Sequence, residues 1–171
     1  METYLNSVVK RFQSYKTLGE STFNQLKDED LLWQYNQQSN SIAIIVQHMA
    51  GNMLSRWTGF LNTDGEKEWR NRDTEFDTVT TTRQELLAQW NAGWECLFNA
   101  LNSITEADWE KTVYIRNEPH SVVDAINRQL THYPYHVGQI VLIGKMLAPD
   151  WKPLSIPPGK SDDFNAEKFN K

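Results

Sequence analysis

The chain has 171 residues, of which 39% are hydrophobic, 12% aromatic and 23% charged, and its formal net charge is −5. This length fits a single domain, residues 1–171, and the apolar content excludes a wholly disordered chain. The acidic balance argues against nucleic acid as a partner, and the single cysteine excludes both an internal disulfide and a four-cysteine metal site.

Helical spacing begins at the N-terminus, which lacks the basic and apolar regions of a signal peptide. Apolar side chains from Tyr4 to Leu26 recur mostly at steps of three and four residues, which predicts a first helix over residues 2–27. No run of residues approaches the roughly 18 apolar positions that a membrane span requires. We therefore expect a cytoplasmic protein that does not have a membrane as a partner.

A second helix is predicted after the polar run 37–40, because Ser39 or Asn40 can accept from the free N–H groups at its start. Its apolar stripe extends from Ile42 to Phe60. The polar segment 62–81 that follows is longer than the usual connection between the helices of a bundle, which marks it as a candidate functional loop.

A third helix is predicted to begin at Thr82, which forms the pattern of a capping box with Glu85. Its apolar stripe covers residues 86–104. The segment 105–119 comes next, and within it only residues 112–115 have a short extended pattern.

A fourth helix is predicted from Ser121 to about Leu147. Four long amphipathic helices without a long alternating strand pattern predict an all-α protein with a four-helix bundle. A long loop follows the second helix, and the irregular tail 148–171 holds four of the six prolines and is expected to pack on the surface of the domain. The aromatic and apolar stripes of the first and third helices offer a surface for a homodimer.

Three of the four histidines suggest a metal site. His132 and His136 are four residues apart, so their imidazoles lie one turn apart on one helix face and can reach a single ion. His48 lies at the flank of the apolar stripe of the second helix. His132 and His136 lie in the same way at the flank of the apolar stripe of the fourth helix. Pro134 predicts a bend, which either aims the two rings inward or has no role. The alternative to a metal site is a set of half-buried, hydrogen-bonded histidines, because spacing does not show that the second and fourth helices are neighbours.

The segments 41–52, SIAIIVQHMAGN, and 132–140, HYPYHVGQI, together resemble the DinB/YfiT-like superfamily of metal-dependent four-helix bundles. The resemblance covers nearly the whole chain and is greatest to a branch of unknown function, in which residues 65–66, 69–73 and 154–161 also recur. It implies that one metal ion is bound by three histidines, His48, His132 and His136. The resemblance also implies that the relatives of this chain include thiol-dependent transferases and proteins that form dimers.

Three neutral imidazoles suit zinc or nickel, with iron or manganese as alternatives. Three protein ligands leave at least one position open, whereas a closed structural zinc site normally has four. The open position suits a metal-bound water, whose pKa falls to about 7 on zinc, or a thiolate. Cys96 lies away from the apolar stripe of its helix, so a low-molecular-weight thiol from solution, as the relatives imply, is the expected ligand.

We therefore expect a metal-dependent enzyme that acts on a small molecule by thiol transfer. The first alternative is a metal-dependent hydrolase, for which Asp73 or Glu75 of the long loop has to reach the metal as a general base. The second alternative is a non-catalytic metal-binding module of a stress response.

Five further side chains are candidates for the substrate site or for catalysis: Asn52, Arg56, Trp69, Arg70 and Gln139. Arg56 lies within an apolar stripe and needs either a buried ion pair or an anionic ligand group. Asn52 shares the flank of His48, and Gln139 lies near His136 and can orient its ring. Trp69 and Arg70 lie in the long loop, close to Arg72. They either cover the groove at the histidines or belong to a solvated charged loop.

Overall fold

The computed structural model describes residues 2–77 and 80–169 of the chain. The described part is mostly helical, and none of its helices is long and apolar enough to cross a membrane. Its elements, in chain order, are α1 (Glu2–Phe23), α2 (Asp28–Leu31), α3 (Ile42–Trp57), the 3-10 helix η1 (Asp73–Phe76), α4 (Arg83–Asn102), the 3-10 helix η2 (Glu106–Asp108), β1 (Thr112–Ile115), β2 (Glu118–Ser121), α5 (Val122–Leu147) and α6 (Ser161–Phe169).

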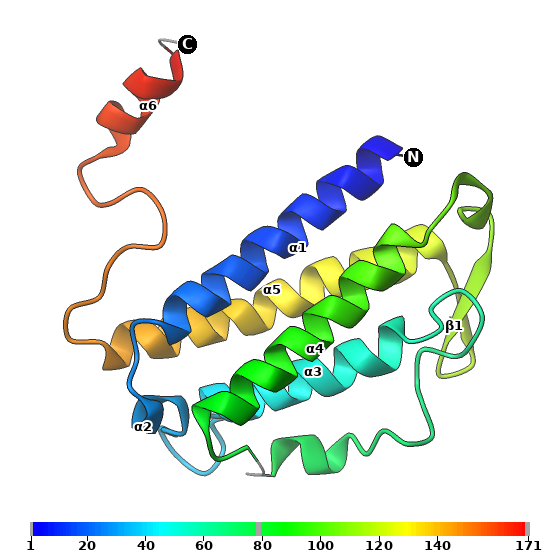
Figure 1. Ribbon diagram of the computed structural model, residues 1–171, viewed down its shortest axis with the longest axis horizontal. Coiled ribbons are helices and arrows are strands. Elements are labelled where there is room, and N and C mark those ends of the chain that lie inside the picture. The colour runs from blue at the N-terminus through cyan, green and yellow to red at the C-terminus, as the bar shows by residue number, and fades with distance from the viewer. Residues whose placement is uncertain (1, 78–79, 170–171) are drawn as a thin grey trace.

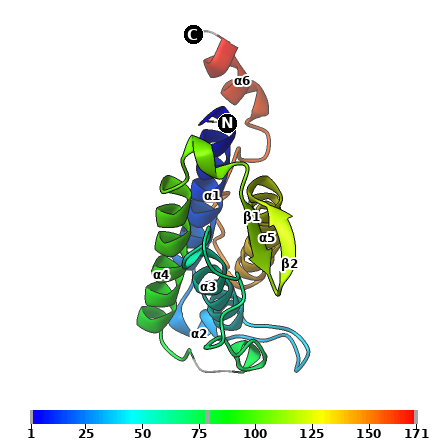
Figure 2. The same ribbon diagram turned by 90° about the vertical axis from the view of Figure 1, so that its right-hand side faces the viewer.

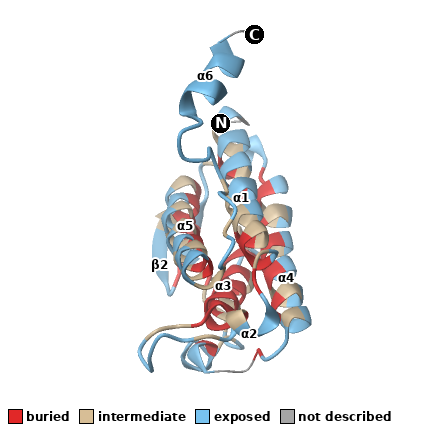
Figure 3. Ribbon diagram, turned by 90° about the vertical axis from the view of Figure 1, so that its left-hand side faces the viewer, coloured by how far each residue is buried: buried red, intermediate tan, exposed pale blue. Residues whose placement is uncertain are grey.

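The buried apolar side chains of the four long helices form a shared core, and Figures 1 and 2 show how these helices are arranged. α3 packs against α4 and α5, and α1 packs against α5 and α4. Phe12 of α1, Trp94 of α4 and Tyr133 of α5 are fully buried, and their ring centroids are 5.9 to 6.1 Å apart. Figure 3 shows the buried faces of the long helices turned toward one another. The stripes of α1 and α4, from which a homodimer surface is expected, thus contribute to the interior of the chain itself.

Local capping signals set the starts of α4 and α5, as the sequence predicts. The Thr82 hydroxyl accepts from the backbone N–H of Glu85 at 3.2 Å, and the Glu85 carboxylate accepts from the backbone N–H of Thr82 at 3.2 Å. The Ser121 hydroxyl accepts from a backbone N–H in the first turn of α5 at 3.1 Å. α5 then continues through Pro134 to its predicted end at Leu147.

The boundaries of the first two long helices differ from the prediction. α1 ends at Phe23 rather than at residue 27. α3 is capped by Ser41, not by Ser39 or Asn40. The reason is local, because the Ser39 hydroxyl is engaged in the preceding turn, where it accepts from the backbone N–H of Asn36 at 2.9 Å.

The expectation of an all-α protein needs a correction, because β1 and β2 form an antiparallel hairpin with Thr112 opposite Ser121. At its turn Arg116 and Asn117 have φ angles of 56° and 61°, as a two-residue hairpin turn requires. The carboxylate of Asp64 accepts from the backbone N–H groups of both residues, at 2.8 and 2.7 Å. The long loop is therefore tied to the hairpin. Strands of four residues are too short for periodicity to predict firmly.

Within its described residues, 148–169, the tail is held on the helices near its start. The Gln25 side chain accepts from the backbone N–H of Lys152 at 2.6 Å and donates to its carbonyl at 3.2 Å. Leu154 is half-buried, whereas every residue from 155 to 169 is exposed. α6 extends away from the four long helices (Figure 1). The large apolar side chains of residues 155–169 are exposed as well: Ile156, Phe164 and Phe169.

Candidate metal centre

Three histidines from two neighbouring helices come together. His48 lies on α3 and is buried, and His132 and His136 lie one turn apart on α5 and are half-buried. One ring nitrogen of each lies within 4.8 Å of the other two. The Nε2 atoms of His132 and His136 are 3.1 Å apart. Two nitrogens on a tetrahedral zinc ion, each at about 2.0 Å, lie roughly 3.3 Å from one another. This pair therefore has a spacing that fits one metal ion.

Side-chain oxygens orient the three rings. Each Nδ1 atom faces one such oxygen: His48 faces Glu75 at 2.9 Å, His136 faces Gln139 at 2.9 Å and His132 faces Gln129 at 3.3 Å. An oxygen that only accepts requires the proton on Nδ1, which leaves the lone pair of a neutral ring on Nε2. Two such lone pairs 3.1 Å apart repel each other unless a cation lies between them. The donor set thus fits a metal ion.

Burial keeps two of the rings neutral. Burial, followed by the charges of His136 and His48, lowers the pKa of His132 to about 3. Burial, with the charge of His48, also lowers the pKa of His136. A metal ion binds the neutral imidazole, so protons compete little for these nitrogens near pH 7.

Glu75 reaches the site from η1, where Arg70 holds it. Arg70 donates to both carboxylate oxygens of Glu75, at 2.7 and 2.9 Å, in a bidentate pair. Burial alone would raise the pKa of Glu75, but hydrogen bonds from His48 and Arg70, with the charge of Arg70, outweigh it and lower the pKa. Asp73, the other loop carboxylate considered as a general base, is exposed. Glu75 is therefore engaged in orienting His48.

A pocket of about 380 Å³ opens beside His48 and His132. Its volume lies in the range of small-molecule sites, about 300 to 1,000 Å³. Five of its lining residues are arginines: Arg56, Arg70, Arg72, Arg116 and Arg128. The wall next to the histidines is therefore strongly basic in a chain whose net charge is −5.

The structure brings most of the further candidate residues to this region. Asn52, Arg56 and Arg70 line the pocket, and Gln139 orients a histidine. Arg56 is 8% exposed, and its guanidinium donates to the carbonyl of residue 65 and lies 3.4 Å from a carboxylate oxygen of residue 66. Trp69 is 61% exposed and is not among the lining residues. The loop therefore turns Arg70 toward the site and leaves its neighbour Trp69 in solvent.

Cys96 lies outside this region. Its thiol is half-buried on α4 and lies 3.5 Å from the hydroxyl of Thr58. It is not among the residues that line the arginine-rich pocket. A thiol at the histidines would accordingly have to come from solution.

Four pocket residues are not anticipated from the sequence: Gln129, Thr131, Arg116 and Arg128. The sequence could have indicated Gln129, because this residue precedes His132 by three positions and so lies on the same helix face. Arg128 precedes His132 by one turn. Arg116 gave no such signal, because only the folded hairpin carries it to the pocket.

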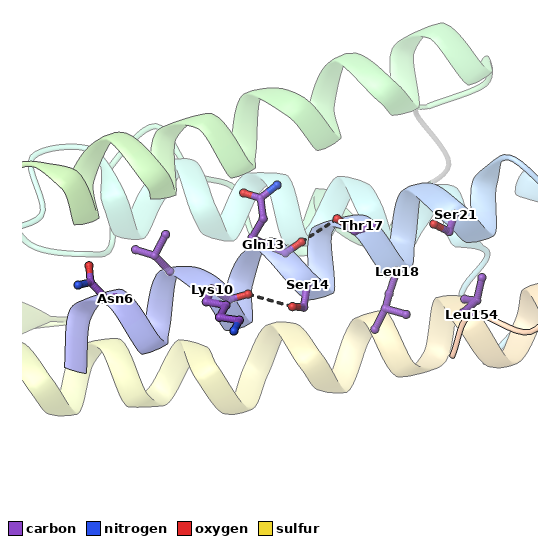
Figure 4. Close-up of a pocket in the computed structure, with 9 residues that line it drawn as sticks. Asn6, Lys10, Gln13, Ser14, Thr17, Leu18, Ser21 and Leu154 are labelled. Atoms are coloured by element: carbon purple, nitrogen blue, oxygen red, sulfur yellow. Dashed lines mark hydrogen bonds between the residues drawn. The ribbon is translucent and has the colours of Figure 1, made fainter. Parts of the chain in front are cut away.

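A second pocket, of about 620 Å³, lies along α1, with Leu154 at one end (Figure 4). The hydroxyls of Ser14 and Thr17, which line it, donate to carbonyls of their own helix at 2.9 and 3.0 Å. Its lining residues include no histidine, cysteine or carboxylate. It therefore lacks the side chains that commonly bind a metal ion.

Comparison with models of protein families identifies the family of the chain. The model of a family described as a protein of unknown function (DUF1572) matches residues 1–160. No curated protein matches the chain. Neither result assigns a ligand or a reaction to the histidines.

Proposed function

We infer the function from the site itself, because the chain belongs to the DUF1572 family, whose function is unknown. We propose that His48, His132 and His136 hold one divalent metal ion, zinc or nickel before iron or manganese. The observation that carries this proposal is the convergence of three ring nitrogens within 4.8 Å of one another, including two Nε2 atoms 3.1 Å apart. We also propose that the four long helices form a DinB/YfiT-like four-helix bundle. The positions of the histidines on its second and fourth members support this.

We propose that the site transfers a thiol to a small molecule. Three protein ligands leave a position open, and the pocket adjoins His48 and His132. A divalent ion bound there supplies a positive charge that lowers the pKa of a thiol. In the reaction the thiol loses its proton to solvent water, its sulfur forms a bond to an electrophilic carbon, and the leaving group departs with the electrons of the bond that breaks. Asn52 and Arg56 line the pocket and serve to bind and orient the small molecule.

The surroundings of Glu75 favour transfer over hydrolysis. Hydrolysis needs a general base beside the metal. Glu75 is the described loop carboxylate that reaches the histidines, but His48 and Arg70 engage both of its oxygens. A non-catalytic metal module is less well supported, because the pocket opens beside the histidines.

A homodimer is a further part of the proposal. Support comes from α5, where Tyr135, Leu142 and Met146 are each at least 59% exposed and are spaced by seven and four residues, on one helix face. Light scattering that gives the monomer mass of 19.9 kDa would contradict it.

Elemental analysis of protein purified without a metal-affinity tag tests the metal. We expect about one ion per chain in the wild type and its loss in His48→Ala and His132→Ala. His120→Ala is the matched control, because this histidine contacts Asp124 and lies outside the cluster. Circular dichroism verifies that each variant is folded. Equal metal content in all variants, or none in the wild type, would refute the site.

A screen of small thiols with electrophiles tests the reaction. We expect the wild type and His120→Ala to turn over at least one pair, and His132→Ala to lose at least about 99% of that rate, because its metal ligand is gone. Equal rates in the wild type and His132→Ala, or no turnover by either, would exclude thiol transfer. The metal content decides the metal site separately.

A further inference from the structure

We propose that the pocket beside the histidines binds a small organic anion through its arginines, so that the substrate carries a carboxylate or phosphate group. The role of this anion as the substrate rests on the proposed function. The binding site itself is argued from the pocket alone, without reference to a metal.

The first observation is the concentration of positive charge. The five arginines come from four separate segments: Arg56 from α3, Arg70 and Arg72 from the loop before η1, Arg116 from the hairpin turn and Arg128 from α5. No aspartate or glutamate is among the residues that line the pocket. Folding thus gathers like charges, and a bound anion would lower their mutual repulsion.

The second observation is that few carboxylates neutralise these arginines. One carboxylate, that of Glu66, is shared by Arg56, Arg70 and Arg116, at 3.4, 3.4 and 3.1 Å. Glu75 is already held by Arg70 and a histidine. Two carboxylates therefore serve three guanidinium groups, with none left for the remaining two.

Arg72 and Arg128 are those remaining two. Neither makes an ion pair with any residue that the structure describes. The guanidinium of Arg72 lies over the ring of Phe76, 5.5 Å from its centroid, and this ring stacks on His48 at 4.9 Å. Contact with a ring face leaves the N–H groups at the edge of the guanidinium available. Arg128 lies one helical turn before His132 and so belongs to the same face of α5.

The third observation is that the side-chain amide of Asn52 offers hydrogen-bond donors to the pocket. The indole N–H of Trp57 can only donate, and it lies 3.0 Å from the hydroxyl oxygen of Tyr133. This hydroxyl therefore donates its own proton to Oδ1 of Asn52, at 3.0 Å. The amide oxygen of Asn52 is thus occupied, and its N–H groups have no partner in the part of the chain that is described. Asn52 adds donors to a wall already rich in them.

These features select the ligand class. The planar guanidinium fork matches carboxylate and phosphate oxygens with two parallel hydrogen bonds. Arg56 is 8% exposed, whereas Arg72, Arg116 and Arg128 are exposed. A volume of about 380 Å³ suits a small molecule that reaches these side chains from solvent.

Calorimetric titration of the protein as purified tests this inference. The probes are succinate and inorganic phosphate, with succinamide as the neutral counterpart of succinate. We expect at least one anion to bind the wild type and succinamide not to bind. Arg72→Gln and Arg128→Gln should each weaken anion binding about tenfold or more, because each removes a charged hydrogen-bond donor. Arg11→Gln, an exposed arginine of α1 outside the pocket, is the matched control and should bind as the wild type does.

The metal content of the same variants separates this inference from the proposed function. Anion binding that depends on Arg72 and Arg128 in a protein without metal would support the anion site and refute the metal site. A normal metal content with equal anion affinity in all variants would overturn the anion site alone. Failure of both anions to bind the wild type at millimolar concentration would also overturn it. The relative affinity for succinate and phosphate identifies which group the arginines accept.

Discussion

At the scale of single residues, Gly51 and Glu75 form a contact on which the geometry of the histidines depends. Gly51 lies on α3, three residues after His48. A Cβ atom there would overlap Oε1 of Glu75 and lie 2.9 Å from its Cδ atom. Glu75 cannot easily yield, because Arg70 and His48 hold its two oxygens. Because Gly51 has no side chain, the carboxylate of Glu75 can reach the ring of His48.

We therefore expect Gly51→Ala to weaken metal binding about ten- to a hundredfold, the usual effect of displacing a group that orients a ligand histidine. Competition with a coloured chelator measures the dissociation constant. Gly138→Ala is the matched control, because a Cβ at Gly138 meets nothing within 4 Å. It should keep the affinity of the wild type. Equal affinities in both variants would show that Glu75 has no part in holding the metal ligand.

At the scale of elements, the crossing of α1 and α4 depends on one close approach. Gly19 of α1 lies against the ring of Trp90 on α4, and a Cβ there would lie 2.5 Å from Cζ2. The ring is fixed in turn by edge contacts with Phe23 at 5.1 Å and with Trp94 at 5.4 Å. A side chain at Gly19 would have to push these two helices apart.

Gly19→Ala should accordingly lower the free energy of unfolding by about 1 to 3 kcal/mol, the usual cost of overpacking a core. Gly138→Ala, the same change at an exposed helix position, should raise it by about 0.5 to 1 kcal/mol through helix propensity. Urea denaturation of the two variants measures both values. A stabilised Gly19→Ala variant would mean that the helices do not meet at this distance.

Among the elements, the sequence could predict those features that depend on residues within one helical turn. The starts of α4 and α5 were predictable because Thr82 and Ser121 act on N–H groups within one turn. The cap of α3 was not, because three polar residues compete there and a turn engages Ser39. The spacing of His132 and His136 is also a local property of a helix. Their meeting with His48, and the arrival of Glu75, depend on how helices and loop pack, which no periodicity encodes.

At the scale of the whole molecule, the histidine cluster connects parts of the chain that are far apart in sequence. His48 comes from α3, His132 and His136 come from α5, and Glu75 brings the long loop to them. A metal ion held there would bind the folded chain in preference to the unfolded chain. Its binding free energy then adds to the stability of the fold.

Saturating zinc should therefore raise the melting temperature of the metal-free protein. At 100 times the dissociation constant the gain is about 2.7 kcal/mol, which for a domain of this size corresponds to a shift of roughly 5 to 10 °C. Differential scanning calorimetry measures the shift. His120→Ala should show the full shift and His132→Ala little or none. A shift of the same size in His132→Ala would place the stabilising ion elsewhere.

The arginines of the pocket have a consequence for kinetics as well as for affinity. The chain as a whole carries a net charge of −5, which repels an anion approaching from a distance. Five arginines on one concave wall reverse the field locally and draw the anion to that wall. Encounter is then steered by long-range attraction, and added salt shortens its reach. The rate of capture should fall with ionic strength, while the rate of escape, which depends on contacts inside the pocket, should change much less.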